Sequence, residues 1–361
     1  MTEACDLHLA RAWLLARLSG HLDLVRSRVD ELLALADGEL IDAIGGAGAP
    51  ALRAELEQFD GGAARAAARR ARLEAICPCA PSFPSGLRAL PRAPGAVYVA
   101  GGLERCLALL GGESVAIVGA RRASQYGLEV ARSLARGVAC TGVPVISGMA
   151  MGIDSAAHEG ALSVAGATIA VLPGSADRAY PAAKRSLHRR IVEVGAVISE
   201  LPPGTEIRRW MFPARNRIIA ALSEMAIIVE ARHRSGALLT ARHAGRLGRA
   251  VGAVPGRVTS PQSAGPNRLL ALGATVVRDA QDVLDALFGA GVRRAGTTPR
   301  AELEPEEAEL LHAVASGQDT MEALTRAGIA PERALAALAT LELGGHIRRE
   351  PGGRFAVRPA V

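Results

Sequence analysis

The sequence predicts an α/β protein whose centre is a Rossmann-like, mostly parallel sheet, with a helical segment before it and a winged helix after it. Between residues 97 and 288, short apolar runs rich in β-branched residues alternate with amphipathic stretches of helix length. This is the pattern of a sheet that helices cover on both faces. Hydrophobic residues make up 49% of the chain but aromatic residues only 3%, so small aliphatic side chains must build the core.

Residues 1–76 show the apolar spacing of helices and predict a helical domain, interrupted at Asp37-Gly38 and Gly45-Gly46. The expected helices are 7–18, 22–36, 39–44, 51–59 and 63–76. Residues 77–96 are rich in proline and glycine and predict an arm that connects this domain to the next.

The central domain, 97–288, holds the expected sheet. The expected strands are 97–99, 115–118, 143–147, 168–172, 196–199, 225–229, 251–254 and 275–277, and helices are expected at 125–138, 155–165 and 187–194. Sheets of this kind bind ligands beyond the carboxyl ends of their strands, so the loops at that edge form the candidate site.

The C-terminal part divides into an expected linker, 289–299, and a small domain, 300–361. Expected helices at 303–315, 321–327 and 331–343 precede Gly344-Gly345 and two short runs, 346–349 and 354–358, which together predict a winged helix. Such domains often read duplex DNA with the third helix. Here the charges at the start of that helix are Glu332 and Arg333, so we favour a role in protein contacts or dimer tuning.

Positive charge is concentrated in one window of the chain. The formal net charge is +6 with a pI of about 9.5, and nine arginines against Glu224 and Glu230 give residues 208–249 a charge of +7. Such a window favours a polyanionic partner, although a solvated arginine face is the plain alternative.

The loop at 118–127 joins an expected strand to an expected helix. Gly119 allows a tight turn, and Ser124 is placed to cap the helix. Arg121 and Arg122 add cations beside the helix N-terminus, which favours a phosphate group. Because Arg121 stands where a GxGxxG loop has its second glycine, a dinucleotide on bare backbone is disfavoured. A simple tight turn is the alternative.

A second loop, 147–155, has the same strand-to-helix form and carries Ser147, Gly148 and Gly152. Asp154 fits a turn or cap residue better than a catalytic acid. His158, alone near the helix start, is expected to be structural.

A third loop, 172–185, places Tyr180 near Lys184, the only lysine of the chain, and Arg185. The ring could stack on a base while the two cations meet phosphates. Packing of Tyr180-Pro181 explains the aromatic residue equally well.

Two further segments extend the pattern. Arg215, Asn216 and Arg217 stand at an expected helix start, and Ser235-Gly236, followed by Thr240, opens another helix. If all these loops lie at one sheet edge, they form a continuous cationic groove suited to a single nucleic-acid strand.

Other site classes find little support. The five cysteines have no CxxC spacing and fit reduced thiols in a cytosolic protein. Arg11 and Arg17 interrupt the N-terminal segment, which makes a poor signal peptide, and no apolar run is long enough to span a membrane. We expect no catalytic residue, no metal site and no cofactor.

These segments together resemble the DNA-processing protein A family (DprA, or Smf), over residues 83–287. The resemblance is carried by Phe83-Pro84, Leu87, Leu90, Pro94, Gly119-Ala120-Arg121, Ser124, Tyr126-Gly127, 147–154, Asp177, Tyr180-Pro181, Phe212-Pro213, Arg215-Asn216-Arg217, Ser235-Gly236, Leu239-Thr240-Ala241, 253–256, Gly265 and Asn267.

The resemblance implies a cytoplasmic, non-catalytic protein of natural transformation. Such proteins bind and protect incoming single-stranded DNA, displace or bypass single-strand binding protein, and load the RecA recombinase. They dimerise through the extended Rossmann domain and commonly add a SAM-like N-terminal domain and a C-terminal winged helix. The family's phosphate pocket implies a role for Arg121 and for a basic residue in the loop of Lys184 and Arg185.

The chain departs from the family pattern at Pro173, Lys184 and Ala237, where glycine, asparagine and serine are usual.

The main alternative is a nucleotide-binding or nucleotide-hydrolysing enzyme of the related LOG group. That group needs a PGGxGTxxE-like loop, whereas residues 235–241 contain one glycine and no acid. Arg121 disfavours a mononucleotide or NAD sensor, and a protein-interaction scaffold would leave the arginine window unused.

Overall fold

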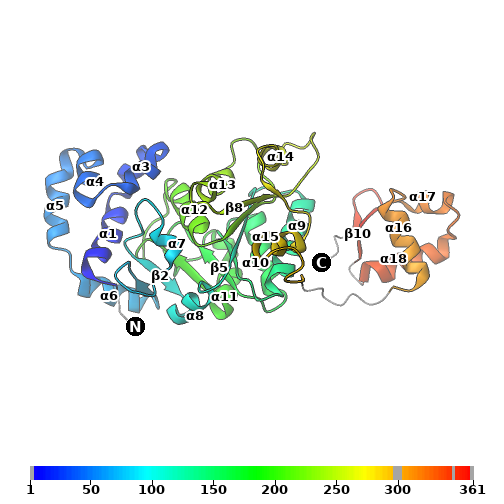
Figure 1. Ribbon diagram of the computed structural model, residues 1–361, viewed down its shortest axis with the longest axis horizontal. Helices are drawn as coiled ribbons and strands as arrows, with labels where there is room; N and C mark the ends of the chain where they lie inside the picture. The colour runs from blue at the N-terminus through cyan, green and yellow to red at the C-terminus, as the bar shows by residue number, and fades with distance from the viewer. Residues whose placement is uncertain (1–3, 296–302, 344–345, 358–361) are drawn as a thin grey trace. The chain divides into compact units, whose positions relative to one another are not determined.

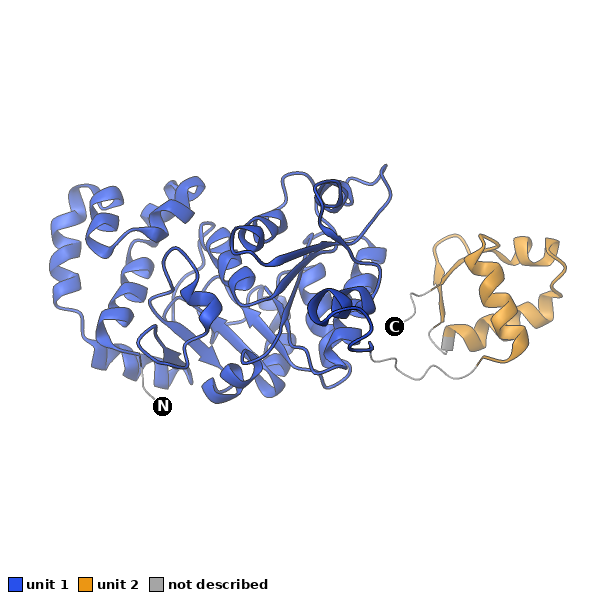
Figure 2. Cartoon of the chain, in the orientation of Figure 1, with its two compact units in different colours: residues 1–295 blue, residues 296–361 orange. Residues whose placement is uncertain are grey.

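The computed structural model describes residues 4–295, 303–343 and 346–357. The chain forms two compact units, residues 1–295 and 296–361 (Figure 2). The expected linker, 289–299, is described only as far as residue 295, and its remainder lies outside the described residues. In the parts of the chain that are described, no helix has both the length and the apolar character that crossing a bilayer requires.

The first unit begins with short helices that pack around a leucine-rich core. They are α1 (Asp6–Arg17), α2 (Ser19–Leu24), η1 (Arg26–Arg28), α3 (Val29–Ala34), α4 (Asp37–Ile44), η2 (Gly46–Gly48), α5 (Ala49–Glu57) and α6 (Gly61–Arg70). The expectation of a single helix at 22–36 is wrong, because the 3-10 turn η1 divides this segment. No glycine or proline marks that turn in the sequence.

The sheet has nine strands in the described part of the chain, and most neighbours are parallel. The strands are β1 (Glu74–Ile76), β2 (Val97–Ala100), β3 (Val115–Val118), β4 (Val145–Ser147), β5 (Thr168–Val171), β6 (Ala196–Ser199), β7 (Met225–Ile228), β8 (Ala250–Ala253) and β9 (Thr275–Val276). Their order is β1-β2-β6-β5-β4-β3-β7-β8-β9.

One edge of the sheet departs from the parallel arrangement. β2 pairs antiparallel with both β6 and β1. The segment that forms β1 was expected to end a helix at residue 76, and that expectation is wrong. A short apolar run fits either period, and pairing of Ala75 with Tyr98 in the sheet decides for the strand.

Helices cover both faces of the sheet, as its alternating apolar side chains require (Figure 1). Val115 and Ile117 of β3 face one layer, and Ala116 and Val118 face the other. The covering helices are α7 (Ser85–Arg88), α8 (Leu103–Leu109), α12 (Met211–Ala221) and α13 (Ala237–Arg246) on one face, and α9 (Gln125–Ala139), α10 (Ile153–Leu162), α11 (Arg185–Val194) and α15 (Ala280–Phe288) on the other. The unit also contains η3 (Ala182–Lys184) and α14 (Ala264–Ala271).

The second unit has the expected winged-helix arrangement. Its elements are α16 (Pro305–Ala315), α17 (Met321–Arg326), α18 (Pro331–Leu343), β10 (Ile347–Glu350) and β11 (Arg354–Val357). The two strands pair antiparallel, with Ile347 opposite Val357. Gly344-Gly345 and the last residue of the run expected at 354–358 lie outside the described residues.

Candidate functional site

A cavity of about 880 Å³ opens at the carboxyl ends of β3 and β7. The chain continues from β3 to β4 on one side and returns to β7 on the other, so this is the switch point where open α/β sheets bind ligands. The turns after β3, β4, β7 and β8 all contribute to its lining. The sequence-based expectation of a shared loop edge is therefore confirmed for the turns after β3, β4 and β7, whereas the turn after β8 was not among the expected site loops.

Arginine dominates the lining of this cavity. Of the described residues that line it, eight are arginines and two are aspartates, Asp30 and Asp154. The arginines are Arg26, Arg121, Arg122, Arg209, Arg215, Arg232, Arg234 and Arg242. So many guanidinium groups give the cavity a strong positive potential, which attracts polyanions.

Arg121 stands at the boundary between this cavity and a smaller one of about 100 Å³. Its side chain is exposed, and its guanidinium carbon lies 4.5 Å from the centroid of the Phe212 ring. The ring of Tyr180 packs against Phe212 at a centroid distance of 5.6 Å. Arg121 thus contacts one aromatic ring, which in turn contacts a second, and a cation beside aromatic rings is a combination suited to a phosphate and a stacked base.

The helical domain supplies part of the wall. Trp210, directly before α12, donates its ring N–H to Ser19 Oγ at 3.1 Å and its backbone N–H to Asp23 at 3.0 Å. Trp210 is buried among the leucines of the N-terminal helices. This packing brings Arg26 and Ser27 to the cavity rim. No local pattern predicts this contact, because the two segments are far apart along the chain.

Arg215 lines the cavity as a buried residue and is not an exposed cation. Its side chain is buried and donates to the carbonyl of Gly148 at 2.7 Å, to the carbonyl of Val171, and to Asn216 Oδ1. Burial lowers the pKa of its guanidinium to about 10, although nearby Asp154 opposes the effect. Any Cβ at Gly148 would overlap this guanidinium, which explains why glycine stands there.

Asp154 was expected to be a turn or cap residue, and that expectation is wrong, because Asp154 is the second residue of α10 and Gly152 is the N-cap. Its carboxylate accepts from the backbone N–H groups of Ala150 and Gly119, and burial raises its pKa while Arg215 opposes that shift. Gly152, with φ of 83°, lies so close to the carbonyl of Ala120 that a side chain there would collide with it. The first two loops are thereby locked together.

The N-terminus of α9 differs from the expectation of a phosphate site. The Ser124 backbone N–H donates to Glu230 at 2.8 Å, and the Ser124 hydroxyl donates to the same carboxylate at 2.5 Å. Ser124 Oγ also accepts from Gly127, as a cap should. A carboxylate of the chain itself therefore fills the position that we expected for a phosphate, since both are anions attracted to a helix N-terminus.

Four other expected site residues turn inward or away. Ser147 is buried and donates to the carbonyl of Ile117, while Arg217 forms a buried ion pair with Glu200 at 2.5 Å. The 211–221 helix begins before residue 215, so the expectation of a helix start there is wrong. Lys184 pairs with Glu159 at 3.1 Å, and neither it nor Arg185 lines the two cavities.

The remaining expected residues do line the large cavity. They are Gly119, Arg122, Asn216, Ser235, Gly236 and Thr240. Asn216 donates to the carbonyl of Gly236 at 3.1 Å and so connects α12 to the start of α13.

Comparison with known proteins adds independent findings. A profile of the family described as DNA recombination-mediator protein A matches residues 74–288, and a profile of the DprA winged helix domain matches residues 294–353. A putative DNA processing protein DprA of Mycobacterium tuberculosis is 42% identical over 239 residues, which cover 64% of this chain and 61% of that protein. The chain thus spans less than two thirds of the length of this relative. The DNA processing protein DprA of Bacillus subtilis is 34% identical, over 66% of this chain and 80% of that protein.

Two solved structures share the fold. The X-ray structure of DNA processing protein A from Streptococcus pneumoniae has a TM-score of 0.63 and 31% identity, and the match covers 78% of this chain and 98% of that one. DNA processing protein A from Helicobacter pylori, described by its single-stranded DNA binding mode, has a TM-score of 0.54 and 30% identity, with 60% and 95% covered.

Proposed function

Because the chain belongs to the DNA recombination-mediator protein A family, we propose that it binds single-stranded DNA along the arginine-lined cavity. The observation that carries this proposal is the convergence of arginines from the turns after β3 and β7, from α12 and from the N-terminal helices on one sheet edge. Phosphates lie against the guanidinium groups, which are bidentate donors to phosphate oxygens. Tyr180 and Phe212 offer ring faces on which bases stack.

Within this site, Arg121 is the central anchor. It is exposed, it lines both cavities, and its contact with Phe212 holds the guanidinium in place. Arg215 is buried, and its hydrogen bond to the Gly148 carbonyl keeps the second loop in position. The helix N-terminus occupied by Glu230 takes no phosphate in this proposal.

We further propose that this binding is non-catalytic. The carboxylates beside the loops are already engaged, Asp154 by the amides of Ala150 and Gly119 and Glu230 by Ser124. These contacts give both carboxylates structural roles, which supports a binding function. The family resemblance supports a cytoplasmic homodimer of natural transformation that protects incoming DNA, works with single-strand binding protein and loads RecA.

The binding proposal is tested by fluorescence anisotropy with an oligo-dT probe and a duplex of equal length, over a range of salt concentrations. Each phosphate contact contributes about 0.7 to the slope of log affinity against log salt for a single strand. Arg121→Ala is expected to weaken binding about tenfold or more and to flatten that slope by about 0.7. Arg189→Ala removes an exposed arginine that does not line the cavity and serves as the matched control.

Unchanged affinity in Arg121→Ala would refute the anchor assignment, and equal affinity for duplex and single strand would refute a single-strand groove. The RecA proposal has its own test, namely the rate of RecA filament formation on DNA coated with single-strand binding protein. If the chain binds DNA but does not accelerate that step, the loading role is wrong while the binding role stands.

A further inference from the structure

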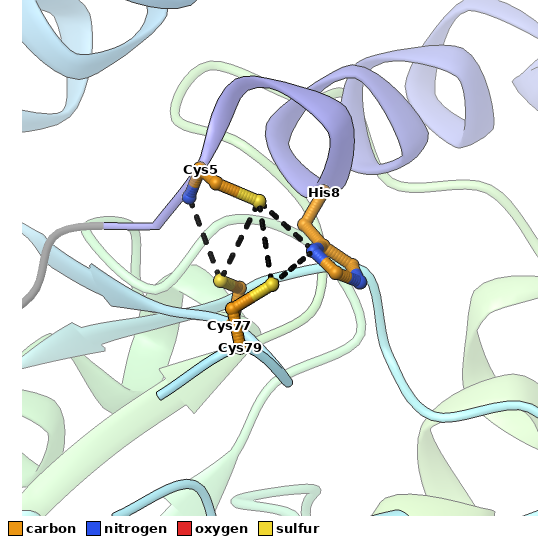
Figure 3. Close-up of side chains that lie close together, drawn as sticks. All are labelled: Cys5, His8, Cys77 and Cys79. Atoms are coloured by element: carbon orange, nitrogen blue, oxygen red, sulfur yellow. Dashed lines mark hydrogen bonds between the residues drawn. The ribbon is translucent and has the colours of Figure 1, made fainter. Parts of the chain in front are cut away.

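Four side chains that bind metals well lie together at the start of α1. Cys5, His8, Cys77 and Cys79 point toward one another, and their ligand atoms all lie within 4.8 Å of one another (Figure 3). Two come from the N-terminal end of α1, in a Cys-x-x-His spacing, and two follow β1 in a Cys-x-Cys spacing. None of the four lines the arginine cavity.

Three of the four distances between these ligand atoms match one tetrahedral ion, and the fourth, between Cys5 Sγ and His8 Nδ1, is about 0.5 Å shorter. Zinc bonds of about 2.3 Å to sulfur and about 2.0–2.1 Å to nitrogen place tetrahedral ligand atoms about 3.8 Å apart for two sulfurs and about 3.6 Å apart for sulfur and nitrogen. Cys5 Sγ lies 3.8 Å from Cys79 Sγ and 3.9 Å from Cys77 Sγ. His8 Nδ1 lies 3.1 Å from Cys5 Sγ and 3.7 Å from Cys79 Sγ.

The surrounding backbone already supports such a site. The Cys5 backbone N–H donates to Cys77 Sγ at 3.5 Å, a contact that stabilises a thiolate. The Ala4 N–H donates to the carbonyl of Ala75 at 3.2 Å, so the segment before α1 is held beside β1. Cys77 is buried with Leu9 and Tyr98, whereas Cys79 is exposed. The ligands are therefore preorganised and reachable from solvent.

We propose that Cys5, His8, Cys77 and Cys79 bind one structural Zn²⁺ ion that fastens α1 to the edge of the sheet. Three sulfurs and one imidazole are a ligand set that favours zinc, and four protein ligands leave no open position for catalysis. Binding replaces the three thiol protons, so one ion releases up to three protons and leaves the site with one negative charge.

Two other uses of these cysteines fit the geometry less well. An iron–sulfur cluster needs cysteines spread around several metal and sulfide atoms, but here every ligand atom lies within 4.8 Å of the others. A disulfide would involve only two of the sulfurs and would not explain why the third sulfur and His8 lie beside them. His8 Nδ1 contacts two of the three sulfurs, which a shared ion explains directly.

The test is the metal content of the full chain, purified in reducing buffer without added chelator and measured by elemental analysis. We expect about one zinc per chain. Cys5→Ser, Cys79→Ser and His8→Ala should each lower that content. His8→Cys should keep it, because four sulfurs also bind zinc. Cys140→Ser removes an exposed thiol outside the cluster and is the matched control.

Two further readouts do not rely on elemental analysis. Replacing the ion in the wild-type chain by Co²⁺ should produce thiolate-to-metal charge-transfer absorption and the intense visible bands of a tetrahedral ion. A chelator should lower the thermal midpoint of the wild type but not that of Cys79→Ser.

Wild-type protein that carries no zinc and takes up neither Zn²⁺ nor Co²⁺ after reduction would overturn the proposal. So would a zinc content that Cys5→Ser and Cys79→Ser leave unchanged in folded protein. A metal-free chain whose intact mass is lower by a pair of hydrogens would assign the cysteines to a disulfide instead.

Discussion

Acidification should destabilise the first unit through one residue, His158 of α10. Its side chain is fully buried, and its Nδ1 lies 2.7 Å from Thr168 Oγ1. Because that hydroxyl donates to the Val145 carbonyl at 2.6 Å, Nδ1–H must donate to the hydroxyl. Nε2 has no hydrogen-bond partner among the described residues. Protonation would therefore place a charge inside the core.

The size of the effect follows from the pKa. Burial, and then the charges of Arg215 and Lys184, lower the pKa of His158 from 6.5 to about 3, while the Ser147 carbonyl opposes the shift. The unfolded chain accepts the proton first, so stability falls as the pH drops below about 6.5 and is fully present above it. Between about pH 7.5 and about pH 5, the free energy of unfolding should decrease by about 2 kcal/mol from this group.

Urea unfolding followed by tryptophan fluorescence measures this loss, because both tryptophans, Trp13 and Trp210, lie in the first unit. The comparison protein is His158→Gln, whose amide can donate to Thr168 but does not titrate. Other ionisable groups are shared, so the difference between the two pH dependences belongs to His158. If both proteins lose the same stability on acidification, the reasoning about the buried imidazole is refuted.

Three further variants test the site. Gly148→Ala should destabilise the protein by about 1–3 kcal/mol because its Cβ would overlap the Arg215 guanidinium, and chemical denaturation that shows no loss would contradict this packing. Arg217→Met leaves Glu200 buried without its partner and should lower the free energy of unfolding by about 3–5 kcal/mol. The salt slope of DNA binding should be the same in this variant as in the wild type, and a flatter slope would mean that the Arg217 side chain reaches DNA. Arg26→Ala should keep the melting temperature but reduce the salt slope by about 0.7, and an unchanged slope in anisotropy would exclude the helical domain from the binding surface.

The fold was predictable from the sequence because its pattern is local. Strands such as Val115–Val118 consist only of apolar residues, and their burial on both faces is what a parallel sheet under two helical layers requires. The failures occurred where distant segments decide. Glu74–Ile76 became a strand through pairing with β2, and the helix expected at 22–36 is divided without any local marker.

The candidate site was predictable as an edge of the sheet but not as a set of side chains. Arg121, Arg122 and Ser235 were expected at the site and line the cavity. Arg217 was also expected at the site as a loop-edge arginine, but it points into the core, because it forms an ion pair with the buried Glu200. The direction of a side chain depends on what packs against its helix, and residue type alone does not reveal that.

By itself, the sequence determined the strand–loop–helix alternation, the turns that meet at the carboxyl edge and the excess of arginine, since each follows from the order of neighbouring residues. Only the tertiary structure decided that Glu230 fills the N-terminus of α9, that Arg26 reaches the cavity, and that Cys5 and His8 meet Cys77 and Cys79. The physical reason is that each of these contacts joins residues many positions apart, and burial and charge pairing in the folded chain select them from many possible partners.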